Sequence, residues 1–318
     1  MYACIDLGSN SFHLLVGKMV DGKIQIIERC SDKVQLGEGA KKTGVISKAA
    51  FKRGLYCLTN FKQILVQYPI ERYWALGTNT FRVTSNAAEF VAAAAALGIE
   101  ISIISGIQEA VLIYAGVITA LPAFSGNRLI VDIGGGSTEV IIGCGQDRLI
   151  TESMVIGCVT WRDTFFASND RDVLDEAMDT GLLKARAVFQ ANAPALKRAG
   201  WQEVYASSGT VKMLASICES AGGPTRIIEY SKLMELRPSF LDCVADGIEL
   251  AGLKERRLDL LLPGWCIMVG LMEVYGIQAI TFSPTALREG MLDFIVKNKK
   301  TIETMSSSDL PAVSIAES

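Results

Sequence analysis

The stretch "LIVDIGGGSTEVIIG", residues 129–143, places three consecutive glycines, a serine, a threonine and a glutamate between two aliphatic runs. Glycine loses more conformational freedom on folding than any other residue, so three in a row indicate a backbone that approaches another group closely. The residues after the glycines continue as a strand, so the glycines are expected at the tip of a β-hairpin. The spacings GxxxxGK[ST] and GxGxxG, which lead into a helix, do not occur in this stretch.

The chain opens with nearly the same plan in "ACIDLGSNSFHLLVG", residues 3–17. Four pairs of residues align between the two stretches: Asp6 with Asp132, Gly8 with Gly134, Ser11 with Ser137, and Gly17 with Gly143. This repetition predicts an α/β fold of two duplicated domains with a cleft between them, each domain contributing one glycine hairpin. The alternative is a pair of unrelated hairpins that share common residue types.

The order of strands and helices restarts near residue 124. We therefore expect an N-terminal domain over 1–123, a C-terminal domain over 124–300 and a disordered tail over 301–318. Packing of the final helix, at about 285–300, on the first domain is left open as an alternative. Among local features, Ser47 is expected to cap a helix, "TNTFR" to form a polar turn, and 231–250 to form one long helical region.

Composition limits the classes of partner. The net charge of −3 and the pI near 5.5 argue against general affinity for nucleic acid or anionic membranes. The longest apolar stretch, 110–124, is shorter than the roughly 20 residues of a spanning helix. No signal-peptide pattern follows Met1, and the eight cysteines are scattered without a CxxC pair, as reduced thiols would be. A cytoplasmic location is therefore expected.

The hairpin tips have the chemistry of anion binding, because converging backbone N–H groups and hydroxyls bind phosphate oxygens. The expected phosphate contacts from the two tips are Gly8, Ser9, Asn10, Ser11, Gly134, Gly135, Gly136, Ser137 and Thr138. Asp132 and Glu139 flank the second tip, and two carboxylates would repel a phosphate unless a cation lay between them. Mg²⁺ is the expected ion. The alternatives are a turn-capping role for Asp132 and a solvated strand position for Glu139.

His13 is the only histidine of the chain, so metal or triad chemistry that needs several histidines is excluded. A phosphate-facing role and an interior position are both open for it. The basic cluster Lys254, Arg256 and Arg257 is either one side of a path for a polyanion or a solvated face.

Taken together, the motifs resemble the exopolyphosphatase / guanosine pentaphosphate phosphatase family, within the actin-like, sugar-kinase-like and heat-shock ATPase superfamily. The resemblance covers nearly the whole chain. Its motifs are "DLGSNSFHLLV" (6–16), "VQLGEGAKKTGVIS" (34–47), "GTNTFR" (77–82), "ISGIQEA" (104–110), "VDIGGGSTE" (131–139), "GCVTWRDTFF" (157–166), "ASSGTVK" (206–212), "RLDLLLPGW" (257–265) and "ALREGML" (286–292). The resemblance implies two actin-like (ribonuclease H-like) domains.

The resemblance also implies roles for individual residues. The family's ISGxEEA motif places its catalytic glutamate at Glu109, as the general base that deprotonates a water for in-line attack. Asp132 and Glu139 match the family's metal-site carboxylates. The implied further phosphate contacts are Arg82, Gly209, Thr210 and Arg257. One departure is Gln108, which stands where the family has the first glutamate of the acidic pair and removes a charge beside Glu109.

The implied activity is release of the terminal phosphate of inorganic polyphosphate, with Mg²⁺ as cofactor. Hydrolysis of guanosine pentaphosphate to the tetraphosphate is the close alternative, since both substrates present terminal phosphoanhydrides. A phosphate- or nucleotide-binding regulator without turnover and a kinase acting on a small alcohol or acid are alternatives of other classes. Longer members of the family carry a further C-terminal helical region, so a long processive channel within one monomer is not expected here. A homodimer is one way to extend the groove.

Overall fold

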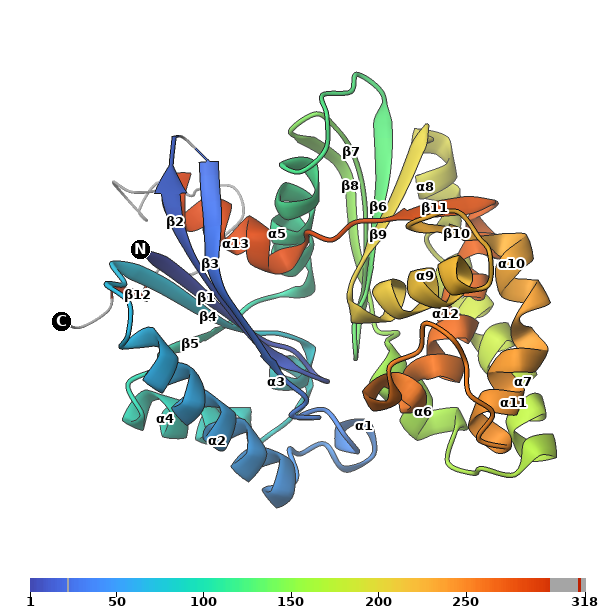
Figure 1. Cartoon of the computed structure of the whole chain (residues 1–318), viewed down its shortest axis with the longest axis horizontal. Helices are drawn as coiled ribbons and strands as arrows, with labels where there is room; N and C mark the ends of the chain where they lie inside the picture. Colours follow the sequence, from blue (N-terminus) through green and yellow to red (C-terminus); the bar gives the residue numbers. More distant parts are fainter. Residues whose placement is uncertain (22, 298–313, 316–318) are drawn as a thin grey trace. The chain divides into compact units, whose positions relative to one another are not determined.

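The computed structural model describes residues 1–21, 23–297 and 314–315 (Figure 1). The chain forms two units: Met1–Ala120 with Thr285–Ser318, and Leu121–Pro284. The second unit is therefore inserted between two parts of the first, and the final helix belongs to the first unit. The tail expected to be disordered, 301–318, lies outside the described residues except for the short strand Ser314–Ile315.

The first unit is a mixed β-sheet covered by helices on both faces (Figure 1). Among the described residues the sheet has the strand order β12-β4-β1-β2-β3, with β5 paired to β4. Its strands are β1 (Tyr2–Leu7), β2 (Phe12–Val20), β3 (Lys23–Asp32), β4 (Arg72–Gly77), β5 (Ile101–Ile103) and β12 (Ser314–Ile315). Its helices are α1 (Ala40–Thr43), α2 (Lys48–Leu65), α3 (Asn79–Val83), α4 (Ala87–Ala96), α5 (Gly106–Ile118) and α13 (Leu287–Lys297).

The second unit repeats this architecture, with the strand order β10-β11-β9-β6-β7-β8 in the described residues. Its strands are β6 (Asn127–Ile133), β7 (Thr138–Cys144), β8 (Asp147–Met154), β9 (Glu203–Ser207), β10 (Ile227–Glu229) and β11 (Ala279–Phe282). Its helices are α6 (Cys158–Phe165), α7 (Arg171–Gln190), α8 (Ala193–Ala199), α9 (Gly209–Ser220), α10 (Tyr230–Glu235), α11 (Arg237–Ala245), the 3₁₀ helix η1 (Glu255–Leu260) and α12 (Leu261–Tyr275).

The two sheets are duplicates in topology. In each, three strands pair in antiparallel succession (β1-β2-β3 and β6-β7-β8), and the first of them also pairs in parallel with a later strand, β4 or β9. Even an irregularity is repeated, because the strand register shifts between Val16 and Gly17 in one unit and between Ile142 and Gly143 in the other. The predicted α/β fold of duplicated domains is confirmed.

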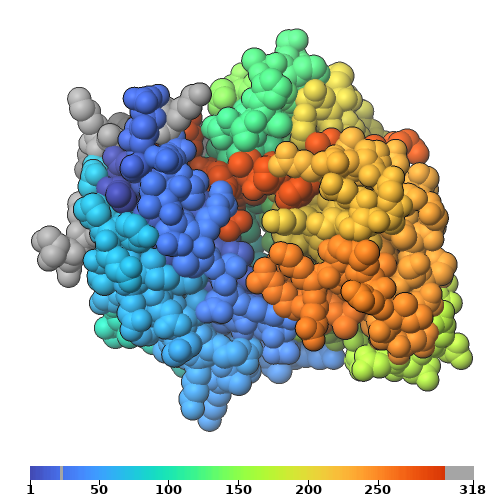
Figure 2. All heavy atoms as spheres, viewed as in Figure 1, coloured from blue at the N-terminus to red at the C-terminus, as the bar shows by residue number. Residues whose placement is uncertain are grey.

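Alternation along the strands explains how each sheet buries its faces. Ile5, Leu7, Phe12 and Leu14 face a core that includes residues of α2 and α4, whereas Cys4 faces α13 and donates to the carbonyl of Arg288. In the second unit, alternate residues of β6 and β7 join a core that includes almost all of α12. Figure 2 shows the outer face of the molecule in the same orientation, with all heavy atoms drawn.

Three local expectations can be compared with the structure. Ser47 caps α2 as predicted, accepting a hydrogen bond from the amide of Ala50 at 3.2 Å. The expectation of a polar turn at "TNTFR" is wrong, because Asn79–Val83 form the short helix α3. The helical region expected over 231–250 is present but ends at Ala245 and consists of two helices. Pro238 lies in the first turn of α11, where its missing N–H is tolerated, and the helical region is divided there into α10 and α11.

One described helical stretch, Glu255–Tyr275, is long and apolar enough to cross a membrane. Of its apolar window, 83% is buried inside the protein, as expected for the core helix that α12 is.

Helix α13 packs on α5 through two glycines that leave room for backbone contact. A Cβ on Gly116 would lie 1.9 Å from the carbonyl oxygen of Ala286, and a Cβ on Gly290 would lie 1.9 Å from that of Leu112. The aromatic rings of Trp74 and Phe294 stack at 5.6 Å on the same side of the sheet. These contacts fix the last helix to the first unit.

We predict that Gly290→Ala lowers the free energy of unfolding by at least about 2 kcal/mol, because the added methyl group meets a backbone carbonyl that cannot rotate away. The melting temperature should fall by about 4–8 °C. Lys297→Ala, on an exposed side chain of the same helix, is the matched control and should change stability by less than about 0.5 kcal/mol. Equal melting temperatures for Gly290→Ala and wild type would contradict the close packing.

Candidate active site

The first hairpin tip, residues 8–11, is held from two sides within its own unit. The amides of Gln35 and Gly37 donate to the carbonyls of Asn10 and Ser9 at 2.8 and 2.9 Å. The hydroxyl of Thr80, in α3, donates to that of Ser9 at 2.8 Å. Ser9 and Asn10 are buried by these contacts. The carbonyls of the tip are thus directed toward the segment that follows β3, and the shape of the tip is fixed.

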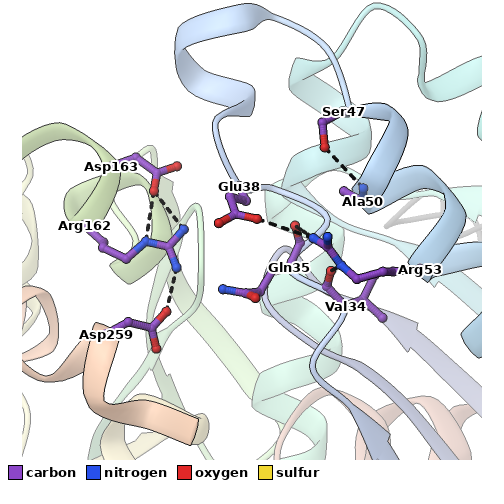
Figure 3. A network of polar contacts seen from close by, with 9 residues as sticks. All are labelled: Val34, Gln35, Glu38, Ser47, Ala50, Arg53, Arg162, Asp163 and Asp259. Carbon is purple, nitrogen blue, oxygen red and sulfur yellow. Dashed lines mark hydrogen bonds and ion pairs between the residues drawn. The ribbon is translucent and has the colours of Figure 1, made fainter. Parts of the chain in front are cut away.

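That supporting segment is itself held by an arginine of α2 (Figure 3). The Nε of Arg53 donates to the carbonyl of Val34 at 2.8 Å, and its Nη2 reaches the carboxylate of Glu38 at 3.4 Å. Side chain and backbone therefore cooperate in fixing residues 34–38 below the first tip.

Glu109 lies in the first turn of α5, where the helix begins with a capping box. The Ser105 hydroxyl accepts from the amide of Gln108 at 3.1 Å, and the side chain of Gln108 accepts from the amide of Ser105 at 2.7 Å. Gln and Glu serve this third helical position equally well. The departure at Gln108 therefore has a structural role that either residue can fill, and Glu109 keeps its place at the start of the helix.

Glu109 is a buried carboxylate paired with an arginine. It is 9% exposed, and its Oε2 lies 3.0 Å from Nη1 of Arg82, which also donates to the carbonyl of Ile104 at 2.8 Å. Burial raises the pKa of Glu109, the Arg82 guanidinium opposes this, and the net direction is upward from the ordinary value. A carboxylate with a raised pKa is a stronger base than an exposed one.

The second tip, residues 134–137, repeats the arrangement of the first. The amide of Gly134 closes it by donating to the carbonyl of Ser137 at 2.9 Å. The carbonyl of Gly134 accepts from the amide of Cys158 at 3.0 Å, and that of Gly135 accepts from Val159 at 2.8 Å. The start of α6 therefore supports this tip.

Thr138 follows the second tip as the first residue of β7 and is fully buried. Its hydroxyl donates to the carbonyl of Ile156 at 2.7 Å, in the loop between β8 and α6. The hydroxyl that the sequence suggested for a phosphate thus joins the strand to that loop, and a phosphate contact of Thr138 stays a prediction.

Asp132 and Glu139 are cross-strand neighbours in the register of β6 and β7, which places their side chains on one face of the sheet. Each accepts from a serine on the next strand outward. The Ser207 hydroxyl donates to Asp132, and the Ser153 hydroxyl donates to Oε1 of Glu139 at 2.8 Å. The four residues form a polar row across β9, β6, β7 and β8. The two serines orient the two carboxylates.

The donor set of this row fits Mg²⁺, which binds oxygen ligands and commonly takes only one or two carboxylates, completing its shell with water and substrate phosphate. Across the described ranges, no group of three or more histidine, cysteine, aspartate or glutamate side chains is placed to hold a metal. Within the described residues, Asp132 and Glu139 are thus a pair that could hold such an ion together with water and a phosphate group.

The equivalent row of the first unit differs at one position. Asp6 lies opposite His13, which lies opposite Ser31. His13 thus occupies the place of Glu139, and its Nδ1 lies 3.2 Å from Nη1 of Arg288. With one carboxylate and a neighbouring arginine, this row is less suited to a cation than its counterpart.

The remaining predicted residues lie at or beside the start of α9: Gly209 and Thr210 in its first turn, and Arg257 in η1. The hydroxyl of Ser208 caps the helix by accepting from the amides of Thr210 and Val211 at 3.1 and 3.2 Å. The guanidinium of Arg257 lies over Gly209 so closely that a Cβ there would be 2.1 Å from Nη2. Burial lowers the pKa of Arg257, and its guanidinium forms no hydrogen bond or ion pair with any other residue in the described parts of the chain. A partly buried cation beside a helix N-terminus favours an anion.

The predicted site residues thus fall into two groups, one in each unit. The first unit holds Gly8, Ser9, Asn10, Ser11, Arg82 and Glu109, and the second holds Asp132, Gly134, Gly135, Gly136, Ser137, Thr138, Glu139, Gly209, Thr210 and Arg257. Within the first group, Thr80 of α3 binds Ser9 of the tip. Within the second group, Ser207 binds Asp132, and Cys158 contacts Thr210. Sequence reasoning did not single out Thr80 or Ser207, although both lie within the quoted motifs "GTNTFR" and "ASSGTVK".

Comparison with known proteins agrees with these motifs. The sequence model of the Ppx/GppA phosphatase family matches residues 15–299. The chain belongs to this family. The predicted family membership and hydrolase class are confirmed, and the choice of substrate within Ppx/GppA phosphatases is a separate question.

Two Ppx/GppA relatives are similar to this chain at the same level. A Haemophilus influenzae protein, provisionally named an exopolyphosphatase, is 36% identical over 308 residues, which cover 96% of this chain and 94% of the relative. An Aeromonas hydrophila protein named guanosine-5'-triphosphate,3'-diphosphate pyrophosphatase is 36% identical over 300 residues. Those residues cover 94% of this chain but only 60% of that relative.

Solved Ppx/GppA structures share the fold. An exopolyphosphatase from Cytophaga hutchinsonii has a TM-score of 0.80 and 26% identity, with 93% of this chain and 98% of that chain covered. The Aquifex aeolicus family member has a TM-score of 0.75 at 24% identity, covering 94% of this chain and 99% of the other. At that identity the second likeness concerns the fold alone.

We predict that Arg82→Gln shifts the acidic limb of the pH–rate profile to higher pH. Arg82 favours the charged form of Glu109, so removing it lets burial raise the pKa further, and more of the carboxyl is protonated at a given acidic pH. The measurement is phosphate release as a function of pH. Arg72→Gln, elsewhere in the same unit, is the control. An unchanged acidic limb would separate Arg82 from the ionisation that controls the rate.

Proposed function

We propose that this protein hydrolyses the terminal phosphoanhydride of inorganic polyphosphate, with Glu109 as the general base. The observation that carries the proposal is a buried carboxylate of raised pKa at the start of α5, in the unit whose glycine tip is also connected to α3. A base of this kind accepts a proton from an attacking water. The Arg82 contact restrains the carboxylate, so that its orientation is set before substrate arrives.

Catalysis of phosphoryl transfer depends mainly on positioning the reacting groups and on neutralising the negative charge of the phosphate oxygens. In our proposal, the backbone N–H groups of both tips bind phosphate oxygens, and Arg257 with the N-terminus of α9 binds a further phosphate. The guanidinium over Gly209 supports this assignment, since it is partly buried and forms no hydrogen bond or ion pair in the described residues.

We further propose Mg²⁺ as cofactor, held by Asp132 and Glu139. When bound, the ion would neutralise charge on the phosphoryl oxygens. The residues of the chain keep the site ready by orienting the two carboxylates with Ser207 and Ser153.

Guanosine pentaphosphate is the second candidate substrate, because the relative bearing that activity in its name matches this chain at the same 36% identity as the exopolyphosphatase relative. Direct competition decides between them. With polyphosphate as the true substrate, release of phosphate from guanosine pentaphosphate is suppressed by equimolar polyphosphate, and the reverse suppression is weak.

A cytoplasmic location is proposed on the thiols. All eight cysteines are free, and six are buried. Reduced cysteines are typical of proteins kept in a reducing compartment. A homodimer and the absence of nucleic-acid or membrane partners remain predictions.

We predict that Glu109→Gln reduces the turnover number for phosphate release by about 10²–10⁴-fold while binding of tripolyphosphate is retained. The amide keeps the size and the hydrogen bond to Arg82 but cannot accept the proton. Glu89→Gln, on α4 of the same unit, is the control and should retain wild-type turnover.

Equal turnover by Glu109→Gln and wild type would contradict the proposed base. Phosphate binding without release by the wild type would favour the regulator, and transfer of phosphate from ATP to a small acceptor would favour the kinase.

We also predict that Asp132→Asn combined with Glu139→Gln weakens Mg²⁺ binding at least about tenfold, because both charged oxygen ligands become neutral amides. Isothermal titration of Mg²⁺ into the protein without substrate measures this directly. Asp172→Asn, in the first turn of α7, serves as control. An unchanged Mg²⁺ affinity would place the ion elsewhere.

A further inference from the structure

Helix α6 connects the anion-binding parts of the second unit. Its first residues dock under the second tip, where Cys158 and Val159 donate to the carbonyls of Gly134 and Gly135. The Sγ of Cys158 also lies 3.3 Å from the hydroxyl of Thr210, in the first turn of α9. The tip and the N-terminus of α9 are thus neighbours through one residue of α6.

The other connection of α6 is an arginine that reaches η1 (Figure 3). Nε and Nη2 of Arg162 bind Asp163, the next residue of the same helix, at 2.9 and 2.8 Å. Its Nη1 binds Asp259 of η1 at 2.6 Å. The side chain of Arg162 is 12% exposed and that of Asp259 is 30% exposed, so the ion pair is partly shielded from water. Charge-assisted bonds of this kind are stronger than neutral ones.

The segment that Arg162 holds is short and lies at the surface. Residues 246–249, 251–252 and 254–256 are exposed, and the orange stretch of the second unit in Figure 2 includes this region. η1 then provides one 3₁₀ segment of six residues, Glu255–Leu260, which carries Arg257 two residues before Asp259. Leu260 is buried and Leu258 packs against the core, but between these apolar anchors Asp259 provides a polar attachment to α6.

Arg257 needs such support, because its guanidinium lies over Gly209 while burial disfavours its charge. Asp259 of the same 3₁₀ helix favours its charge from a distance, but in the described parts of the chain no carboxylate forms a hydrogen bond or ion pair with the guanidinium. The side chain would gain hydration by turning outward, so the position of η1 decides whether Arg257 remains beside the N-terminus of α9.

We propose that Arg162, acting through Asp259, is a positioning residue that holds η1 so that Arg257 stays over Gly209, ready to bind a phosphate group. The inference rests on the proposed function for the role of Arg257 itself. It adds a specific tie between α6, which supports the second tip, and the arginine that binds the neighbouring phosphate. Breaking the tie lowers affinity for the anion and leaves the chemical step largely intact.

The test compares Asp259→Asn with Asp163→Asn. Both variants remove one carboxylate from Arg162, but only Asp259→Asn cuts the connection to η1, so Asp163→Asn is the matched control. Binding of imidodiphosphate, which is not readily hydrolysed, is measured by calorimetry, and the KM for tripolyphosphate by phosphate release. We expect about five- to tenfold weaker binding and a raised KM with nearly unchanged kcat for Asp259→Asn, against less than about twofold for Asp163→Asn.

Arg162→Gln removes the same tie from the α6 side and should match Asp259→Asn, which provides a second variant if either folds poorly. Combining Asp259→Asn with Arg257→Ala shows whether the tie acts through Arg257. The double variant should bind no more weakly than Arg257→Ala alone, because residues that act through one another are not additive.

The possible outcomes distinguish a failure of this inference from a failure of the proposed function. Wild-type affinity in Asp259→Asn and Arg162→Gln, with weakened binding in Arg257→Ala, overturns this inference and leaves the proposed function standing. Additive losses in the double variant overturn it too. Wild-type affinity in Arg257→Ala overturns the proposed phosphate contact, and the inference with it.

Discussion

Backbone hydrogen bonds at the two hairpin tips are the constraint on which the rest of this structure depends. Ser9 and Gly135 occupy equivalent positions in the duplicated units, and the carbonyl of each accepts from an amide in the segment after the third strand. Such bonds direct the carbonyl dipoles of the tip toward the protein and fix a loop that would otherwise be costly to order. Every proposed phosphate contact from the tips requires this fixed backbone.

The two units share one topology, but they differ in the side chains at equivalent positions of their sheets. The register that pairs Asp132 with Glu139 pairs Asp6 with His13, so one half offers two carboxylates and the other a carboxylate with a histidine beside Arg288. The general base proposed in the first unit, Glu109, has no charged neighbour at 108, because Gln108 forms part of the capping box of α5. The proposed metal ligands and the proposed base thus lie at different places of one repeated topology.

Much of the fold was predictable because glycine spacing and alternating apolar residues repeat in the sequence. The duplicated α/β topology and the cap at Ser47 follow from such local rules. The short helix over Asn79–Val83 did not, because its polar residues are stabilised by contacts distant in sequence, such as Thr80 with Ser9. The division of the helical region before α11 has a local signal in the sequence, which is Pro238 itself.

For the site, the motifs supplied the residues that we propose to act directly, whereas most of the residues that support them in the structure were not predicted. Ser153, Arg162 and Asp259 act on partners up to 97 positions away, a relation that no local spacing encodes. Arg82 illustrates the same limit. Its contact with phosphate stays a prediction, and its pairing with Glu109 was not foreseen, because it depends on the folded positions of α3 and the start of α5.

The insertion of one unit within the other has a consequence for biosynthesis. Helix α13, which covers β1 and α5, is made only after all of Leu121–Pro284. During synthesis, residues 1–120 therefore lack the helix that packs on one face of their sheet until the chain is nearly finished. Residues 121–284 are contiguous, so the second unit can complete its core earlier. The unit whose synthesis begins first is therefore the one completed last, and its apolar face is exposed to aggregation in the meantime.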